Sequence, residues 1–310
     1  MQQNFSFTSE SMLTILKSLT KALKTTENLN LTILNPDSYS HYYAGTTITL
    51  ENETYIYRSL RSWMDLATQL GCRMLTPTPY SKELTTLHFQ KLHSDSFHQD
   101  QPQKKSEKYG VDSHFSAINK NEEPAFLTAY LHALELAHIS GKRRILNLGV
   151  NQGDEFALIQ EIVTAEQQKE MTFVGVDHSQ STTKVAQERF TSENFHFYAH
   201  DINEIDTLNL EPFDLIITIG TLQSPGINYK PFLQKLVQEY LSKEGALILG
   251  FPNSRWIDGE MIYGAKMRNY RESDLSLLLN DIDYAKRYLQ QKKFKVRISG
   301  KEYLFLTAYK

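Results

Sequence analysis

The 310-residue sequence contains one cysteine, Cys72, which excludes an internal disulfide framework and suits a reducing cytosol. It has no apolar run near the roughly 18 residues of a membrane-spanning helix, and its first residues lack the basic start and apolar core of a secretion signal. The formal net charge is only −3, so no global basic field points to nucleic acid. We therefore expect a cytoplasmic protein with no membrane partner.

The sequence also lacks a cluster of metal ligands. His88, His93 and His98 recur every five residues, a spacing that does not place them on one helix face, so we predict no metal site. Hydrophobic residues make up 40% and charged residues 22%, as in a soluble globular protein. The length is sufficient for one large domain or two ordinary ones.

A short apolar run, a glycine turn and an amphipathic stretch follow one another at residues 144–163. Residues 145–148 suit a buried strand, Gly149 and Gly153 bracket a tight turn, and helical spacing begins at Phe156. Strand, glycine turn and helix bring backbone N–H groups up to a polar ligand. Two glycines in a turn are a weak signal by themselves.

Three further strands strengthen that signal. Residues 172–177 end in Asp177, residues 195–199 are followed by Asp201, and a strongly apolar run ends at Gly220. Doubly wound sheets bind ligands beyond the carboxyl ends of their strands, where an acid after the second strand can accept both hydroxyls of a ribose. The order of these segments therefore predicts a nucleotide-type ligand.

The four segments together resemble class I S-adenosylmethionine-dependent methyltransferases over about residues 125–310. The resemblance implies S-adenosyl-L-methionine as the cofactor, with Asp177 at its ribose, Asp201 at its adenine and the glycine turn at its methionine portion. The cofactor-binding set that it implies is Asn147, Gly149, Asn151, Gly153, Asp177, His178, Asp201, Ile202 and Gly220.

Two residues depart from the family pattern. Asn147 stands where the family usually has an acid, and asparagine keeps an acceptor but lacks the negative charge near the cofactor's ammonium group. Asp154 or Glu155, at the start of the next helix, could supply that charge. Asn151 stands where glycine is usual, and asparagine tolerates the left-handed conformation better than most residues.

The expected fold is α/β, a Rossmann-like doubly wound seven-stranded sheet with a C-terminal antiparallel hairpin, plus a small N-terminal α+β domain. Residues 1–93 would form the N-terminal domain, with a possible role in substrate recognition. Residues 94–122 would be a linker and possible cofactor lid, and residues 123–310 the methyltransferase domain. The candidate lid residues are Tyr109, His114 and Phe115.

Periodicity, caps and turn residues predict further elements on both sides of the linker. In the N-terminal region they are a helix at 8–25 capped by Thr8 or Ser9, strands at 31–34 and 72–75, a hairpin at 46–57 and a helix at 59–70. In the C-terminal region they are a helix from Pro124 to Gly141, a strand at 245–251, a helix at 273–291 with Ser273 as its cap, and a hairpin of 294–298 and 303–308.

The methyl acceptor should lie beside the loops that follow the fourth and fifth strands of this domain. The first of these loops, Gly-Thr-Leu-Gln-Ser-Pro, is not the Asn-Pro-Pro-Tyr type of amino-methylating enzymes, and neither loop contains a cysteine. In the second, arginines could hold an anionic group and a tryptophan could stack on a ring. The candidate substrate residues are Gln223, Arg255, Trp256 and Tyr263, with Arg268 as a further candidate, and we assign no catalytic base.

Several functions stay open. The favoured one is a methyltransferase that acts on an unidentified small molecule; the basic stretch 286–297 keeps a tRNA or rRNA methyltransferase as an alternative. A catalytically inactive binding protein on the same scaffold is a third possibility, for which Asn147 and Asn151 are the best argument. A nicotinamide dehydrogenase is disfavoured because residues 149–153 do not begin a G-x-G-x-x-G motif. The oligomeric state is not predicted.

Overall fold

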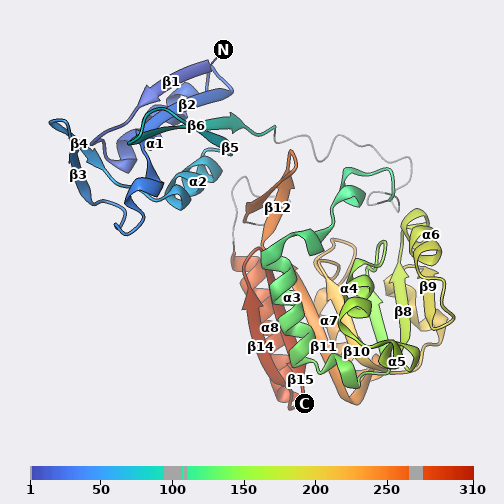
Figure 1. Ribbon diagram of the computed structural model, residues 1–310. Helices are drawn as coiled ribbons and strands as arrows, with labels where there is room; N and C mark the ends of the chain where they lie inside the picture. Colours follow the sequence, from blue (N-terminus) through green and yellow to red (C-terminus); the bar gives the residue numbers. More distant parts are fainter. Residues whose placement is uncertain (1, 94–106, 108–109, 265–274) are drawn as a thin grey trace. The chain divides into compact units, whose positions relative to one another are not determined.

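The computed structural model describes residues 2–93, 107, 110–264 and 275–310 (Figure 1). The chain forms two compact units, Met1–Ser96 with Trp256–Ile262, and Phe97–Arg255 with Tyr263–Lys310. Each unit has its own apolar core. No helix in the described part of the chain is long and apolar enough to cross a membrane.

The first unit contains a four-stranded sheet in the order β1-β2-β6-β5. Strand β1 is parallel to β2, and β6 is antiparallel to both of its neighbours. Apolar residues of the sheet and of two helices, Trp63 and Leu87 among them, form one core. The elements are β1 (Gln2–Ser6), α1 (Met12–Ala22), β2 (Asn28–Leu34), β3 (Thr47–Leu50), β4 (Glu53–Ile56), α2 (Leu60–Gln69), β5 (Cys72–Pro79) and β6 (Leu84–Lys91).

The expected helix at 8–25 begins later than predicted because Ser11, not Thr8 or Ser9, is its cap. The Ser11 side chain accepts a hydrogen bond from the Thr14 N–H group at 3.2 Å. Strand β5 continues through Pro77 to Pro79, beyond the predicted strand at 72–75. It lies at an edge of the sheet, where a missing N–H donor is tolerated. Strands β1 and β6 were not predicted.

The second unit contains a seven-stranded sheet in the order β14-β15-β11-β10-β7-β8-β9. Neighbouring strands from β11 to β9 are parallel, while β15 is antiparallel to both β11 and β14. This arrangement confirms the predicted doubly wound α/β fold with its C-terminal antiparallel hairpin. The strands are β7 (Arg144–Leu148), β8 (Thr172–Asp177), β9 (Phe195–Ala199), β10 (Phe213–Ile219), β11 (Leu241–Pro252), β14 (Lys295–Gly300) and β15 (Tyr303–Tyr309).

Helices cover both faces of this sheet (Figure 1). Alternation along β10 sends Leu215 and Ile217 into the core on one face and Ile216 into the core on the other. The first face is covered by α3 (Pro124–Leu136), α4 (Asp154–Ile162) and α6 (Gln180–Arg189), and the second by α7 (Tyr229–Lys235) and α8 (Ser276–Gln291). The short helix α5 (Ala165–Lys169) precedes β8.

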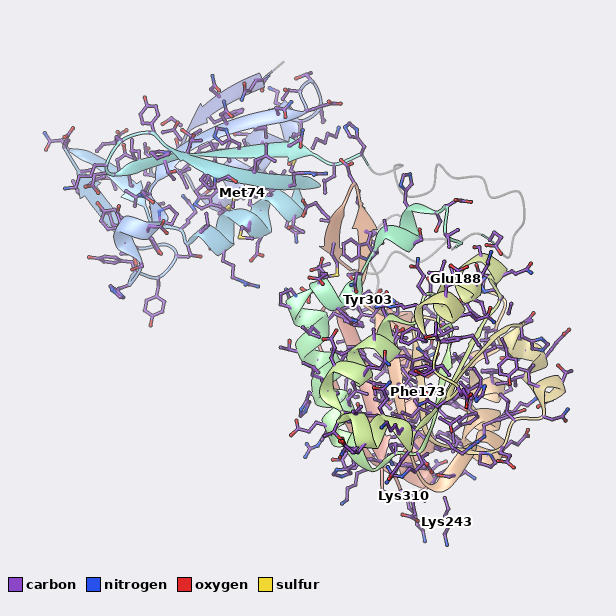
Figure 2. The ribbon with its side chains drawn as sticks, turned by 45° about the vertical axis from the view of Figure 1, so that its right-hand side comes forward. Met74, Phe173, Glu188, Lys243, Tyr303 and Lys310 are labelled. Atoms are coloured by element: carbon purple, nitrogen blue, oxygen red, sulfur yellow. The ribbon has the colours of Figure 1, made fainter. Side chains whose placement is uncertain are left out.

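Figure 2 shows the two edges of the second unit, with Phe173 in its packed interior. Tyr303, at the start of the antiparallel strand β15, marks the edge where the parallel strands end. Lys243 and Lys310 mark the opposite edge, where the parallel strands begin. Ligands of doubly wound sheets bind at the first of these edges.

Several boundaries in the second unit differ from the prediction. Helix α3 ends at Leu136 rather than Gly141, and β11 begins at Leu241 rather than at 245. The described part of α8 begins at Ser276, and the proposed cap Ser273 lies outside the described residues.

The segment after β11 is not the simple loop that the sequence suggested, because it contains two paired strands, β12 (Ser254–Ile257) and β13 (Glu260–Tyr263). Asp258 and Gly259 connect them with φ angles of +51° and +81°. An Asp-Gly pair with two positive φ angles is the usual signal of a tight hairpin, and this signal was present in the sequence.

Candidate functional site

The turn after β7 uses the left-handed backbone conformation at three positions. Gly149, Asn151 and Gly153 have φ angles of +76°, +47° and +85°. The Gly149 N–H group donates to the Val176 carbonyl at 2.8 Å, which fastens the turn to the end of β8. Asn151 therefore adopts the conformation that glycine usually adopts, as the sequence suggested it could.

We expect Gly149→Ala to destabilise the chain by about 3 kcal/mol, because it adds backbone strain and a steric clash. A Cβ atom at this position would lie 2.0 Å from Oγ1 of Thr221. Urea unfolding would measure the effect. Gly141→Ala is the matched control, since a Cβ there meets no atom within 4 Å, and its expected change is within about 0.5 kcal/mol. Equal stabilities of the two variants would contradict this account of the turn.

Asp177 lies at the end of β8 with its carboxylate oriented by the backbone. Its Oδ2 atom accepts from the Asn151 N–H group at 3.0 Å, and its Oδ1 atom accepts from the Ser179 N–H group at 2.9 Å. The residue is 7% exposed, and Nδ1 of the half-exposed His178 lies 3.5 Å from Oδ1. A carboxylate has about four acceptor positions, so two such bonds leave capacity for a ligand's hydroxyl groups.

Asn147 and Glu155 meet beneath the turn. Asn147 Nδ2 donates to Glu155 Oε2 at 3.2 Å, and both residues are buried. Burial raises the pKa of Glu155, while the positive charge of Lys120 acts to lower it. Asp154 instead pairs with Arg189, at 2.6 Å. Of the two acids considered in the sequence, Glu155 is therefore the one beside Asn147.

A segment ahead of α3 contacts this turn. Gln152 Nε2 donates to the Ser116 carbonyl at 3.2 Å, and Asn121 Nδ2 donates to the Asp154 carbonyl at 3.0 Å. Lys120 lies in the same segment, and sequence reasoning did not connect this residue with the site. The signal that could have found Lys120 is that a buried carboxylate such as Glu155 requires a cation nearby.

The candidate lid residues are placed only in part. Tyr109 and the side chain of Phe115 lie outside the described residues, and His114 is exposed. The lid assignment of these three residues stays a prediction.

The remaining candidate cofactor residues follow β9 and β10 at the same edge. Asp201 is exposed, and its Oδ1 atom accepts from the Asn203 N–H group at 2.9 Å. Ile202 is buried. Gly220 follows β10 with a φ angle of +74°, and its N–H group donates to the Gly250 carbonyl at 2.8 Å. The ends of four neighbouring strands thus bring the predicted cofactor residues to one edge of the sheet.

The four candidate substrate residues are divided between the two units. Gln223, Arg255 and Tyr263 belong to the second unit, whereas Trp256 belongs to the first. Arg255 donates to the Gly264 carbonyl at 2.7 Å, and Tyr263 is exposed. The further candidate Arg268 lies outside the described residues.

Two buried oxygen atoms in the loops after β10 and β11 accept no hydrogen bond from the residues described. They are Oε1 of Gln223 and Oδ1 of Asn253. Asn253 Nδ2 donates to the Lys301 carbonyl at 2.9 Å, which turns its amide oxygen away from that partner. Sequence reasoning did not find Asn253, although its place directly after the fifth strand of the domain was a signal.

Within residues 2–93, 107, 110–264 and 275–310, no group of three or more His, Cys, Asp or Glu side chains is arranged to hold a metal ion. A family model described as "Methyltransferase domain" matches residues 139–299. No curated protein matches the chain.

Solved structures similar to the chain include three that share 13–17% sequence identity with it. The N-methyltransferase NodS from Bradyrhizobium japonicum WM9, in complex with S-adenosyl-l-homocysteine, is 17% identical, with 61% of this chain and 89% of that chain covered and a TM-score of 0.41. The plantazolicin methyltransferase BpumL is 14% identical, with coverages of 66% and 93% and a TM-score of 0.45. A SAM-dependent methyltransferase from Aquifex aeolicus is 13% identical, with coverages of 62% and 96% and a TM-score of 0.41. At these identities the likeness concerns the fold alone.

Proposed function

Because the chain belongs to the methyltransferase domain family, we propose that it transfers a methyl group from S-adenosyl-L-methionine to a small-molecule acceptor. The cofactor follows from the family, and it supplies the reactive methyl group on a sulfonium centre. The observation that carries the proposal is the Asp177 carboxylate, oriented by two backbone N–H groups at the ligand-binding edge of the sheet.

The residues at this edge fit the cofactor. Asp177 keeps acceptor positions for the two ribose hydroxyls, with His178 beside it. Asp201 and Ile202 present an exposed acid and an apolar side chain after β9, which suits the adenine. In our proposal the turn from Gly149 to Gly153 holds the methionine portion.

Glu155 lies beside Asn147 and provides a carboxyl group close to the position where the family usually has an acid. Its carboxylate lies within hydrogen-bond distance of the Asn147 amide, at the N-terminus of α4. We propose that it supplies the charge that attracts the cofactor's ammonium group, with Asn147 and Lys120 fixing its position. This arrangement weakens the argument for an inactive scaffold, because the acid is moved rather than lost.

The loops after β10 and β11 support a role in acceptor binding. A buried oxygen without a donor costs free energy, and a ligand with an N–H or O–H group would satisfy it. Oε1 of Gln223 and Oδ1 of Asn253 are two such oxygens. We propose that they orient an acceptor that carries hydrogen-bond donors, since methyl transfer depends chiefly on alignment of the two reactants.

The position of the basic stretch favours a small molecule over RNA. Exposed basic residues lie on the last turns of α8 and along β14. Strand β14 has the direction of the parallel strands, so its first residues lie at the edge opposite the candidate site. Among these residues, Arg287 pairs with Asp283 at 2.9 Å, and Lys292 lies over the ring of Tyr288. Two of the basic residues therefore have structural partners, and the first residues of β14 lie away from the candidate site.

Release of S-adenosylhomocysteine in the presence of pooled small molecules, and separately of tRNA and rRNA, tests the acceptor class. The proposal expects turnover with a small molecule and none above background with either RNA. Turnover with RNA alone would replace the small-molecule assignment but keep the methyltransferase.

Once the methyl acceptor is identified, we expect Gln223→Leu to raise the KM for that substrate by about tenfold. Leucine is similar in shape to glutamine but lacks the amide oxygen that accepts a hydrogen bond. The affinity of the variant for S-adenosylmethionine should stay unchanged. Steady-state kinetics combined with cofactor titration would separate the two effects. An unchanged KM would exclude Gln223 from acceptor binding.

A further inference from the structure

The first unit contains a cleft that the proposed function does not use. Its volume is about 750 Å³, within the range of small-molecule sites. It lies between the two helices of this unit, beside β4 and residues 44–45. The apolar residues that line it include Met12, Leu16, Ile56 and Leu66.

A buried arginine lines the same cleft. Arg58 is only 6% exposed, and its guanidinium group donates to the carbonyls of Glu10 and Ile56 and lies over the ring of Trp63. Burial lowers the pKa of Arg58, and the charge of Glu10 acts in the opposite direction. No ion pair joins Arg58 to a carboxylate of the described residues; Glu10 Oε2 accepts from the Thr8 N–H group instead. Buried cations are normally paired with an anion.

The two helices add further positive potential. Ser11, the cap of α1, and Ser62, in the first turn of α2, both line the cleft. Neither helix has an acidic residue in its first turn. The N-terminus of a helix carries a partial positive charge, and here two of them lie beside a guanidinium group that forms no ion pair with the described residues.

Asp65 limits the charge that the cleft can accept. It also lines the cleft, from the second turn of α2, and it is exposed. A single negative charge beside Arg58 avoids this carboxylate better than an extended polyanion would, and a planar carboxylate matches the guanidinium group in shape.

We propose that this cleft binds a small molecule with an apolar body and one carboxylate, which pairs with Arg58 while the body packs against Met12, Leu16 and Leu66. The apolar walls bury the body, and the helix N-termini and Arg58 select the charge. This site does not depend on the proposed methyl transfer, because every residue that lines the cleft belongs to the first unit.

Octanoate, octanol and octylamine test the proposal on the full chain, because they share one apolar body and differ in the head group. Isothermal calorimetry and thermal unfolding should show binding of octanoate, with octanol at least about tenfold weaker and no binding of octylamine. Equal binding of octanoate and octanol would overturn the role of Arg58, and no binding of octanoate would overturn the site.

Ser62→Glu and Ser62→Gln form a matched pair that avoids altering Arg58. Each places a residue three positions after the cap Ser59, which creates a capping box and should preserve α2. Only Ser62→Glu adds a negative charge at the cleft, so it should bind octanoate about tenfold more weakly than Ser62→Gln. Equal affinities in the two folded variants would contradict an anion site. Neither result bears on cofactor binding in the second unit.

Discussion

Asp177→Asn should weaken binding of S-adenosylmethionine about a hundredfold, because two hydrogen bonds to a charged acceptor are each worth about 1.5 kcal/mol or more. The variant keeps the shape of the side chain but replaces one acceptor oxygen by an NH₂ group, which faces either a backbone N–H group or a ribose hydroxyl. Calorimetric titration with S-adenosylmethionine would measure the loss.

Asp214→Asn is the control that separates binding from stability. Asp214 also accepts two backbone N–H groups, those of Arg143 and Arg144, both at 3.1 Å. It lies near the start of β10, at the opposite edge of the sheet. We expect both variants to lose similar thermal stability, and only Asp177→Asn to lose cofactor affinity. Equal affinity losses, or full affinity in Asp177→Asn, would contradict the ribose assignment.

Asn147→Asp, which restores the residue type usual in the family, should harm this chain. It places a second carboxylate against Glu155, whose Oε2 atom now accepts from Asn147 Nδ2 at 3.2 Å. Two buried carboxylates at this distance cannot both ionise cheaply, so the pKa of one is raised. We expect a loss of roughly 2 kcal/mol or more in the free energy of unfolding at neutral pH.

The pH dependence of that loss has a definite sign. A carboxyl whose folded pKa is raised stabilises the fold while it is protonated, and that contribution is lost as the pH rises through the folded pKa. The deficit of Asn147→Asp relative to the native chain should therefore grow between about pH 5 and pH 8. Unfolding curves at several pH values would measure this difference in the free energy of unfolding. A difference that stays constant with pH would mean that the two carboxyls do not interact.

The double variant Asn147→Asp, Glu155→Gln exchanges the acid and the amide between the two positions. It keeps one negative charge near Lys120 and one amide–carboxylate hydrogen bond, so most of the stability should return. The double variant should also keep cofactor affinity close to that of the native chain, whereas Glu155→Gln alone should lower this affinity about tenfold. Unchanged affinity in Glu155→Gln would limit Glu155 to a structural role.

The sequence was sufficient to predict the seven-stranded sheet and to predict which edge of that sheet binds the ligand. The strands ending at Leu148 and Asp177 are short apolar runs followed by glycine or an acid, and such signals are local in sequence. Parallel strands joined by helices place their carboxyl ends at one edge, so the topology also brought Asp201 and Gly220 there.

Contacts between distant residues were not accessible from local patterns. The choice between Asp154 and Glu155 depended on how α4 is rotated beneath the turn, and on Arg189 and Lys120, which occupy other elements. Strand β1 is mostly exposed, so it lacks the apolar alternation that predicts a strand. It is held in the extended conformation by its backbone pairing with β2, which lies more than twenty residues away in the sequence.

Trp256 shows the same limit. It follows the fifth strand of the methyltransferase unit in sequence, which suggested a role near the acceptor. It is part of the first unit, where Arg73 pairs with Asp258 of the same segment at 3.0 Å, and its role near the acceptor stays a prediction. A short insertion can join a unit that is distant in sequence, and its composition does not reveal which one.

The most direct test of the central claim is calorimetric titration of the native chain with S-adenosylhomocysteine. Our account predicts one site per chain with a dissociation constant of about 1–50 μM, equivalent to roughly 6–8 kcal/mol of binding free energy. Absence of binding at about 1 mM ligand would contradict the account, because neither Asp177 nor Glu155 would then serve a cofactor.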